Sequence, residues 1–339
     1  MVETIYLSED IENVIKIFDM SVFNNKSILI TGATGLLGKL CVKSLLRTQY
    51  NIKVIALVRN LQKAQDIFGE NSKLKIIVQD INSPIKIDDE IDYIIHTASI
   101  TSSKAFFTTP VETITTCING TQNVLELAKS KNVKSFVYLS SLEVYGVQAK
   151  EDITEDDYGF LDILSPRSSY SEGKRMAENL CISYGHEYNL PVKIARLAQT
   201  FGPGVAYEDS RVFAQFARSV INKSDIILNT TGETKRNYCY TADAVRAIFT
   251  ILIKGLDNNA YNVANKNTYI SIVDMAKMLE NENTKVKFMI DGVNRGYNPE
   301  VKIKLNSDKL ERLGWEPKVD LKEMYERMIF DFRQWYGGV

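Results

Sequence analysis

Short apolar segments alternate with amphipathic segments along the first two thirds of the chain. Segments such as residues 111–131 and 171–188 place apolar side chains at helical intervals. The apolar runs between such segments have the length of buried parallel strands and fall at residues 27–31, 53–58, 74–78, 93–97, 135–139 and 192–196. Strands that alternate with helices in this way predict an α/β fold with a doubly wound parallel sheet.

The pattern changes after residue 202, where short strands are interleaved with helices. The strands predicted here are residues 226–229, 260–263 and 286–289. This irregular half is typical of a smaller, mixed α/β lobe that closes one side of a cleft at the carboxyl ends of the main strands. We predict three parts: an N-terminal helical extension at 1–25, a dinucleotide-binding domain at 26–201 and a substrate-binding lobe at 202–339. For the extension the sequence indicates only packing or an oligomer contact.

Composition argues against several functional classes. The chain has 339 residues and a net charge of −1, so no surface for nucleic acid or an acidic membrane is indicated. No apolar run approaches the roughly 18 residues of a membrane span. The four cysteines stand far apart and there are only two histidines, which predicts reduced thiols and no metal site. We expect a cytoplasmic, metal-free protein.

A glycine-rich turn between the first predicted strand and helix is the strongest local motif. Residues 31–38 read TGATGLLG. Gly32 permits the tight turn, Gly35 lets backbone N–H groups approach a pyrophosphate, and Gly38 lets the helix lie close to the sheet. The helix N-terminus offers unpaired N–H donors and a partial positive charge to that anion. Strand, turn and helix in this order predict a dinucleotide site.

A second group of residues predicts hydride-transfer chemistry. Ser141 follows the fifth strand, and Tyr170 and Lys174 lie one helical turn apart. Oxidising a carbinol requires a base, and a free tyrosine with a pKa near ~10 is a poor one. We expect Lys174 and the charge of a nicotinamide to lower the pKa of Tyr170, and Ser141 to orient the same substrate oxygen. Glu143 is either a second base or a hydrogen-bonding residue.

These motifs resemble those of the extended short-chain dehydrogenases/reductases, in the nucleotide-sugar epimerase/dehydratase family. The resemblance covers residues 26–336 and implies a Rossmann-like fold, a bound nicotinamide cofactor, a nucleoside-diphosphate sugar and a homodimer. The shared segments are TGATGLLG, Asp80-Ile81, HTAS at 96–99, SSLEVYG at 140–146, YSEGK at 170–174, RLAQTFGPG at 196–204, KRNYCYTADAV at 235–245 and LGWEP at 313–317.

The resemblance also implies roles for individual residues. The implied catalytic residues are Ser141, Glu143, Tyr170 and Lys174. The implied cofactor-binding residues are Gly32, Thr34, Gly35, Leu36, Leu37, Gly38, Arg59, Asp80, Ile81, Thr97, Ala98, Tyr170 and Lys174. The implied substrate contacts are Ser102, Gln199, Arg211 and Arg236.

The end of the second strand bears on the choice of cofactor. NAD-specific relatives place an acidic residue there, whereas this chain has Val58 followed by Arg59 and Asn60. An arginine at this place pairs with a 2′-phosphate. We therefore predict NADP, with NAD left open because Arg59 can also stack on adenine.

One stretch resembles a particular branch of the family, and several positions differ from the residues that relatives carry there. PRSSYSEGKRMAENLC at 166–181 is similar to the UDP-glucuronate decarboxylase branch, and Glu143 matches the extra acid/base of that branch and of the 4,6-dehydratases. The dehydratases carry an aspartate where this chain has Leu142. Asparagines of the relatives are replaced by Cys117 and Gln199. The decarboxylases carry an arginine near the C-terminal substrate loop, and its candidate counterparts in this chain are Lys302 and Arg295.

Taken together, the sequence predicts an NAD(P)-dependent enzyme of the epimerase/dehydratase type. It would oxidise a nucleoside-diphosphate sugar at C4 and act through a 4-keto intermediate. Decarboxylation of a nucleotide-linked uronic acid and reduction of a 4-keto sugar are the alternatives within the family. A non-catalytic dinucleotide sensor is a more distant alternative, which the intact tyrosine and lysine pair argues against.

Overall fold

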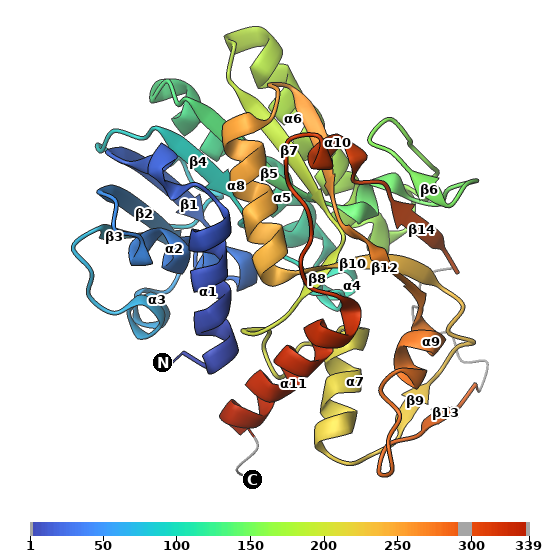
Figure 1. The fold of residues 1–339 in the computed structure, drawn as a ribbon. Coiled ribbons are helices and arrows are strands. Elements are labelled where there is room, and N and C mark those ends of the chain that lie inside the picture. The colour runs from blue at the N-terminus through green and yellow to red at the C-terminus, as the bar shows by residue number, and fades with distance from the viewer. Residues whose placement is uncertain (1–2, 291–299, 337–339) are drawn as a thin grey trace.

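A computed structural model of the chain describes residues 3–290 and 300–336 (Figure 1). Its largest element is a seven-stranded sheet in the order β11-β7-β5-β4-β1-β2-β3, in which every pair is parallel. The strands are β1 (Lys26–Thr31), β2 (Ile52–Val58), β3 (Leu74–Val78), β4 (Tyr93–His96), β5 (Ser135–Ser141), β7 (Val192–Leu197) and β11 (Asn259–Val263). This arrangement confirms the predicted doubly wound, Rossmann-like sheet.

Helices cover both faces of this sheet because side chains alternate along each strand. On β1, Ile28 and Ile30 pack toward α2 (Leu36–Arg47) and α8 (Thr241–Lys254). Leu29 points to the opposite face, in the core formed with α5 (Pro110–Ser130) and α6 (Ser169–Tyr188). Figure 1 shows α2 and α8 on the side nearer the viewer. No helix in the described part of the chain is long and apolar enough to cross a membrane.

The N-terminal extension packs on the first of these two faces. It consists of α1 (Ile5–Ile17) and the short helix η1 (Met20–Phe23), and Figure 1 shows α1 beside α2, α8 and α11 (Leu321–Tyr336). Ion pairs from Glu3 to Lys43 and Arg47 on α2, at 2.7 and 2.5 Å, hold the start of the extension. The packing expected for this segment is therefore present.

The remaining strands form two smaller sheets. The larger has the order β12-β10-β14-β6, and β8 also pairs with β10. Its strands are β6 (Asp152–Ile153), β8 (Gln199–Phe201), β10 (Lys235–Tyr240), β12 (Asn265–Ser271) and β14 (Lys302–Leu305). The other pairs β9 (Ile226–Leu228) with β13 (Val286–Phe288). The other helices are α3 (Leu61–Phe68), α4 (Ala105–Thr108), η2 (Leu142–Tyr145), η3 (Pro166–Ser168), α7 (Val212–Ile221), α9 (Ile272–Lys277) and α10 (Asp308–Glu311).

The chain crosses the boundary predicted at residue 202 in both directions. β11, predicted as a strand of the smaller lobe, instead pairs with β7 in the main sheet. β6, which precedes residue 202, pairs with β14 in the second sheet. Both exchanges satisfy backbone hydrogen bonds at sheet edges, and they join the two lobes through shared sheets rather than through a single linker.

Candidate active site

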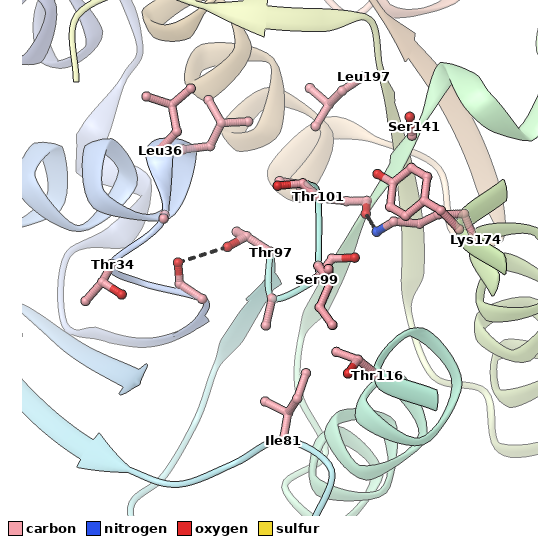
Figure 2. Close-up of a pocket in the computed structure, with 18 of the residues that line it drawn as sticks. Thr34, Leu36, Ile81, Thr97, Ser99, Thr101, Thr116, Ser141, Lys174 and Leu197 are labelled. Carbon is pink, nitrogen blue, oxygen red and sulfur yellow. Dashed lines mark hydrogen bonds between the residues drawn. The ribbon is translucent and has the colours of Figure 1, made fainter. Parts of the chain in front are cut away.

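A cleft of about 700 Å³ lies at the carboxyl ends of the main strands. It is lined by all four predicted catalytic residues and by every predicted cofactor-binding residue. Figure 2 shows Thr34 and Leu36 of the glycine turn on one side and Ser141 and Lys174 on the other. Segments that lie far apart in the sequence meet here because the strand ends of a parallel sheet share one edge.

The glycine turn has the shape that a pyrophosphate requires. Gly32 has a φ of +63°, and a Cβ there would lie 2.6 Å from Thr97 Oγ1. A Cβ on Gly38 would collide with the Gly32 carbonyl oxygen. Helix α2 begins after Gly35, which supplies no side-chain cap, so its first N–H groups are not bonded by a capping side chain. The turn therefore fits the phosphates of a dinucleotide.

The far end of the cleft, beyond β2 and β3, carries polar and basic side chains. Arg59, Lys63, Asp80 and Ile81 line it. Asn60 caps α3 by accepting a hydrogen bond from the Lys63 N–H at 2.9 Å. Sequence reasoning missed Lys63, which lies in the first turn of α3, four residues after Arg59.

The end of the cleft that holds the predicted catalytic residues is formed by α6 and the end of β5. Lys174 is buried, and its Nζ donates to the Leu139 carbonyl oxygen at 2.6 Å and lies 5.8 Å from the Tyr170 ring centroid. Burial raises the pKa of the Tyr170 phenol, while a hydrogen bond with Ser141 opposes that shift. Burial also lowers the pKa of Lys174. The lowering of the Tyr170 pKa was predicted from Lys174 together with the charge of a nicotinamide, so it stays a prediction for the enzyme with bound cofactor; in the chain alone desolvation raises this pKa.

Glu143 lies on η2, directly after β5, and also lines the cleft. Its carboxylate accepts hydrogen bonds from Arg167 and Ser171. The Phe106 ring stacks on Tyr170 with centroids 4.3 Å apart. Sequence reasoning assigned no role to these three neighbours, although Arg167 and Ser171 lie beside Tyr170 in the segment 166–181 that resembles the decarboxylases.

The predicted substrate contacts are only partly brought together. Gln199 and Arg211 line the cleft, whereas Ser102 and Arg236 do not. The Arg211 guanidinium is held by Asp209, with Nε–Oδ1 and Nη2–Oδ2 distances of 3.0 and 2.6 Å. Two of the four predicted substrate contacts therefore line the cleft.

Arg236 lies on β10, two residues before Tyr238, which pairs with Gln199 of the cleft. Its Nε is buried and has no hydrogen-bond partner within the described part of the chain. Lys302 on β14 is more than half exposed and lies 3.9 Å from Glu151. The other candidate for the decarboxylase arginine, Arg295, lies outside the described residues.

Comparisons with known proteins agree with this geometry. Residues 28–264 match the NAD dependent epimerase/dehydratase family. UDP-glucuronic acid decarboxylase 3 of Arabidopsis thaliana is 31% identical over 316 residues, which cover 91% of this chain and 90% of that protein. An epimerase from Methanothermobacter thermautotrophicus has the same fold, with a TM-score of 0.81 and 22% identity over 94% of this chain and 95% of that chain. UDP-glucose 4-epimerase from Thermotoga maritima has a TM-score of 0.74 and 25% identity over 91% and 99% of the two chains. As the motifs predicted, the chain belongs to the NAD-dependent epimerase/dehydratase family of enzymes.

Proposed function

We propose that the enzyme oxidises a nucleoside-diphosphate sugar at C4 and acts through a 4-keto intermediate. The observation that carries this proposal is that Ser141, Tyr170 and Lys174 share one cleft with the glycine turn. A nicotinamide cofactor, when bound there, supplies the acceptor for the hydride from C4. The chain's own residues then accept and donate protons and orient the sugar.

Tyr170 accepts the proton of the C4 hydroxyl. Ser141 donates a hydrogen bond to the same oxygen when the substrate is bound, in place of its present hydrogen bond with Tyr170, while its Oγ accepts the Glu143 N–H at 3.3 Å. Lys174 holds a positive charge behind the phenol ring. These roles match general-base catalysis of carbinol oxidation.

Glu143 serves the step that follows ketone formation. A ketone at C4 acidifies the C5–H bond, and a carboxylate in the cleft is placed to remove or return that proton. Return of the hydride to the sugar then closes a redox-neutral cycle, which is the epimerase/dehydratase type of reaction.

Decarboxylation is the second candidate, favoured by the similarity to UDP-glucuronic acid decarboxylase 3. In a nucleotide-linked uronic acid, the C4 ketone makes the C6 carboxylate part of a β-keto acid. Breaking the C5–C6 bond then releases CO₂ and leaves an enolate at C5. Protonation of C5 and return of hydride to C4 complete a redox-neutral cycle.

Arg211 and Arg236 hold the diphosphate of the substrate in this proposal. Two features support it: Arg211 lines the cleft, and the buried Nε of Arg236 has no hydrogen-bond partner among the described residues. Guanidinium groups bind phosphate oxygens in a bidentate manner, and Arg236 gains the partner that the described residues do not provide.

NADP is the preferred cofactor in this proposal. Arg59 and Lys63 line the adenosine end of the cleft, and β2 ends at Val58 with no carboxylate following it. Two cations against the single carboxylate of Asp80 at this end of the cleft favour binding of a 2′-phosphate. Titration of the cofactor-free protein should give a lower Kd for NADPH than for NADH, and a lower Kd for NADH would contradict the preference.

The enzyme works as a cytoplasmic homodimer in this proposal. Support comes from the resemblance and from apolar residues on the outer faces of the paired helices, with Val111 on α5 at 67% and Met176 on α6 at 53% exposure. Light scattering on the purified protein should give twice the chain mass of 38.4 kDa.

The direct test is turnover of UDP-, dTDP-, CDP- and GDP-sugars, including UDP-glucuronic acid, followed by mass spectrometry and by absorbance near ~340 nm. A new sugar nucleotide should form with the wild-type protein and not with Tyr170→Phe. Mass spectrometry of molecules released from the purified protein identifies cofactor and nucleotide independently. A wild-type protein that binds a dinucleotide but converts none of these sugars would overturn the proposal in favour of a sensor.

A further inference from the structure

The carboxylate of Glu143 is held by residues on both sides of Tyr170 in the sequence. Arg167 Nη2 donates to both carboxylate oxygens, at 3.0 Å to Oε1 and 3.1 Å to Oε2. Ser171 Oγ donates to Oε2 at 3.1 Å. Arg167 lies on η3 and Ser171 in the first turn of α6, so the start of the catalytic helix binds the acidic side chain that follows β5.

The Arg167 guanidinium is itself fixed by an aromatic layer. Its centre lies 4.9 Å from the centroid of the Phe106 ring. That ring is parallel to Tyr170 within 9° and stacks on it at 4.3 Å. Phe106 and Tyr170 are buried, with 3% and 7% of their surface exposed, so the stack is shielded from water and its geometry is well defined.

We propose that Arg167 is a positioning residue that orients the Glu143 carboxylate for the proton transfer after C4 oxidation. The inference rests on the proposed function. A glutamate side chain has three rotatable bonds, and proton transfer requires an oxygen within hydrogen-bond distance of the proton. Oε2 accepts two hydrogen bonds and Oε1 accepts one, so Oε1 is the freer oxygen for the substrate.

A general role in supporting the η2 turn does not account for Arg167, because another arginine has that role. Arg175 Nε donates to the Val144 carbonyl oxygen and its Nη2 to the Gly159 carbonyl oxygen, both at 2.7 Å. Arg175 therefore holds the backbone of the turn and the following loop. Within the described ranges, the hydrogen bonds of Arg167 go to the side chain of Glu143 alone.

The test separates the two chemical steps in a single turnover with a sugar that the wild type converts. In Arg167→Met we expect formation of reduced cofactor within about 3-fold of the wild-type rate and a step after it that is slowed roughly 10- to 100-fold. Arg167→Lys, which keeps a donor near Glu143, should recover part of that loss. Lys287→Met, which removes an exposed ion pair with Asp225 beside the two-stranded β9–β13 sheet, is the control and should leave both steps unchanged.

A double-mutant cycle tests whether Arg167 acts through Glu143. The Arg167→Met/Glu143→Gln protein should be no slower in the second step than Glu143→Gln alone. Additive losses, or equal slowing of both steps, would overturn the proposal. Crystal structures of the wild type and Arg167→Met give a readout without turnover: the carboxylate should be ordered in the first and displaced in the second. If Glu143 does not move in Arg167→Met, the positioning role is refuted, whether or not the wild type converts a sugar. If the wild type converts no sugar, only the proposed function is refuted.

Discussion

Replacing Asp10 with asparagine should remove a pH-dependent part of the protein's stability. Asp10 on α1 is 1% exposed, and its two oxygens accept the Tyr240 hydroxyl at 2.9 and 2.7 Å. Arg327 of α11 lies 3.3 Å from one of them. Burial raises the pKa of Asp10 to about 7, with Asp243 and Glu9 adding to the shift and Tyr240 and Arg327 opposing it.

The size of this stability change follows from the difference between the Asp10 pKa in the folded protein and in the unfolded chain. The folded protein keeps the Asp10 proton up to about pH 7, whereas the unfolded chain releases it near the ordinary pKa of 3.8. The contribution of Asp10 to the free energy of unfolding is thus fully present below about pH 4 and is lost as the pH rises through 7. At about 1.4 kcal/mol per pH unit it totals about 4 kcal/mol, of which about 2–3 kcal/mol disappears between pH 5 and 8.

The assay compares thermal unfolding of the wild type and Asp10→Asn at pH 5 and pH 8. Asparagine stays neutral and keeps an oxygen for Tyr240, so other titrating groups cancel in the difference. With an unfolding entropy of about 2 cal/mol/K per residue, the Tm of the wild type relative to the variant should fall by about 4 °C. Glu12→Gln, at a largely exposed place on the same helix, should show no such change. A Tm of the wild type relative to Asp10→Asn that is constant or rises with pH would refute the reasoning.

Three further substitutions test the cleft. Tyr170→Phe should lower kcat by roughly two to four orders of magnitude with cofactor affinity retained by calorimetry, and near wild-type turnover would contradict its role as base. Gly38→Ala places a Cβ against the Gly32 carbonyl oxygen and should weaken dinucleotide binding more than about 100-fold; unchanged affinity would show that the turn relaxes. Arg59→Glu should raise the Kd of NADPH about 100-fold and that of NADH far less, and equal changes by fluorescence titration would argue against a 2′-phosphate contact.

The parts of the site that the sequence predicted are those encoded over short distances. The glycine turn and the tyrosine and lysine pair each lie within one local element, where spacing alone fixes the relative placement of side chains. The parallel, doubly wound sheet followed from alternating strands and helices, because each helix returns the chain to start the next strand in the same direction.

The parts that could not be predicted depend on contacts between distant segments. Arg167 and Glu143 are 24 positions apart and meet only because η3 brings the chain back beside the turn after β5. β11 carries no signal that distinguishes an edge strand of the main sheet from a strand of the smaller lobe. Periodicity indicates which face of a strand is buried, but the choice of neighbour depends on the packing of the whole chain.

The N-terminal extension, for which the sequence indicated only packing or an oligomer contact, is linked to the cofactor turn by a short series of hydrogen bonds. Thr4 donates to Asp331 of α11 at 2.5 Å, and the other oxygen of Asp331 accepts the Gly204 N–H at 2.8 Å. The Gly204 carbonyl oxygen accepts Lys39 Nζ at 3.3 Å, and Lys39 lies in the first turn of α2, directly after the glycine motif. Both ends of the chain thus brace the helix whose N-terminus faces the cleft. Since dinucleotide binding depends on how closely that helix approaches the sheet, we expect α1 and α11 to support the predicted cofactor site from outside the cleft.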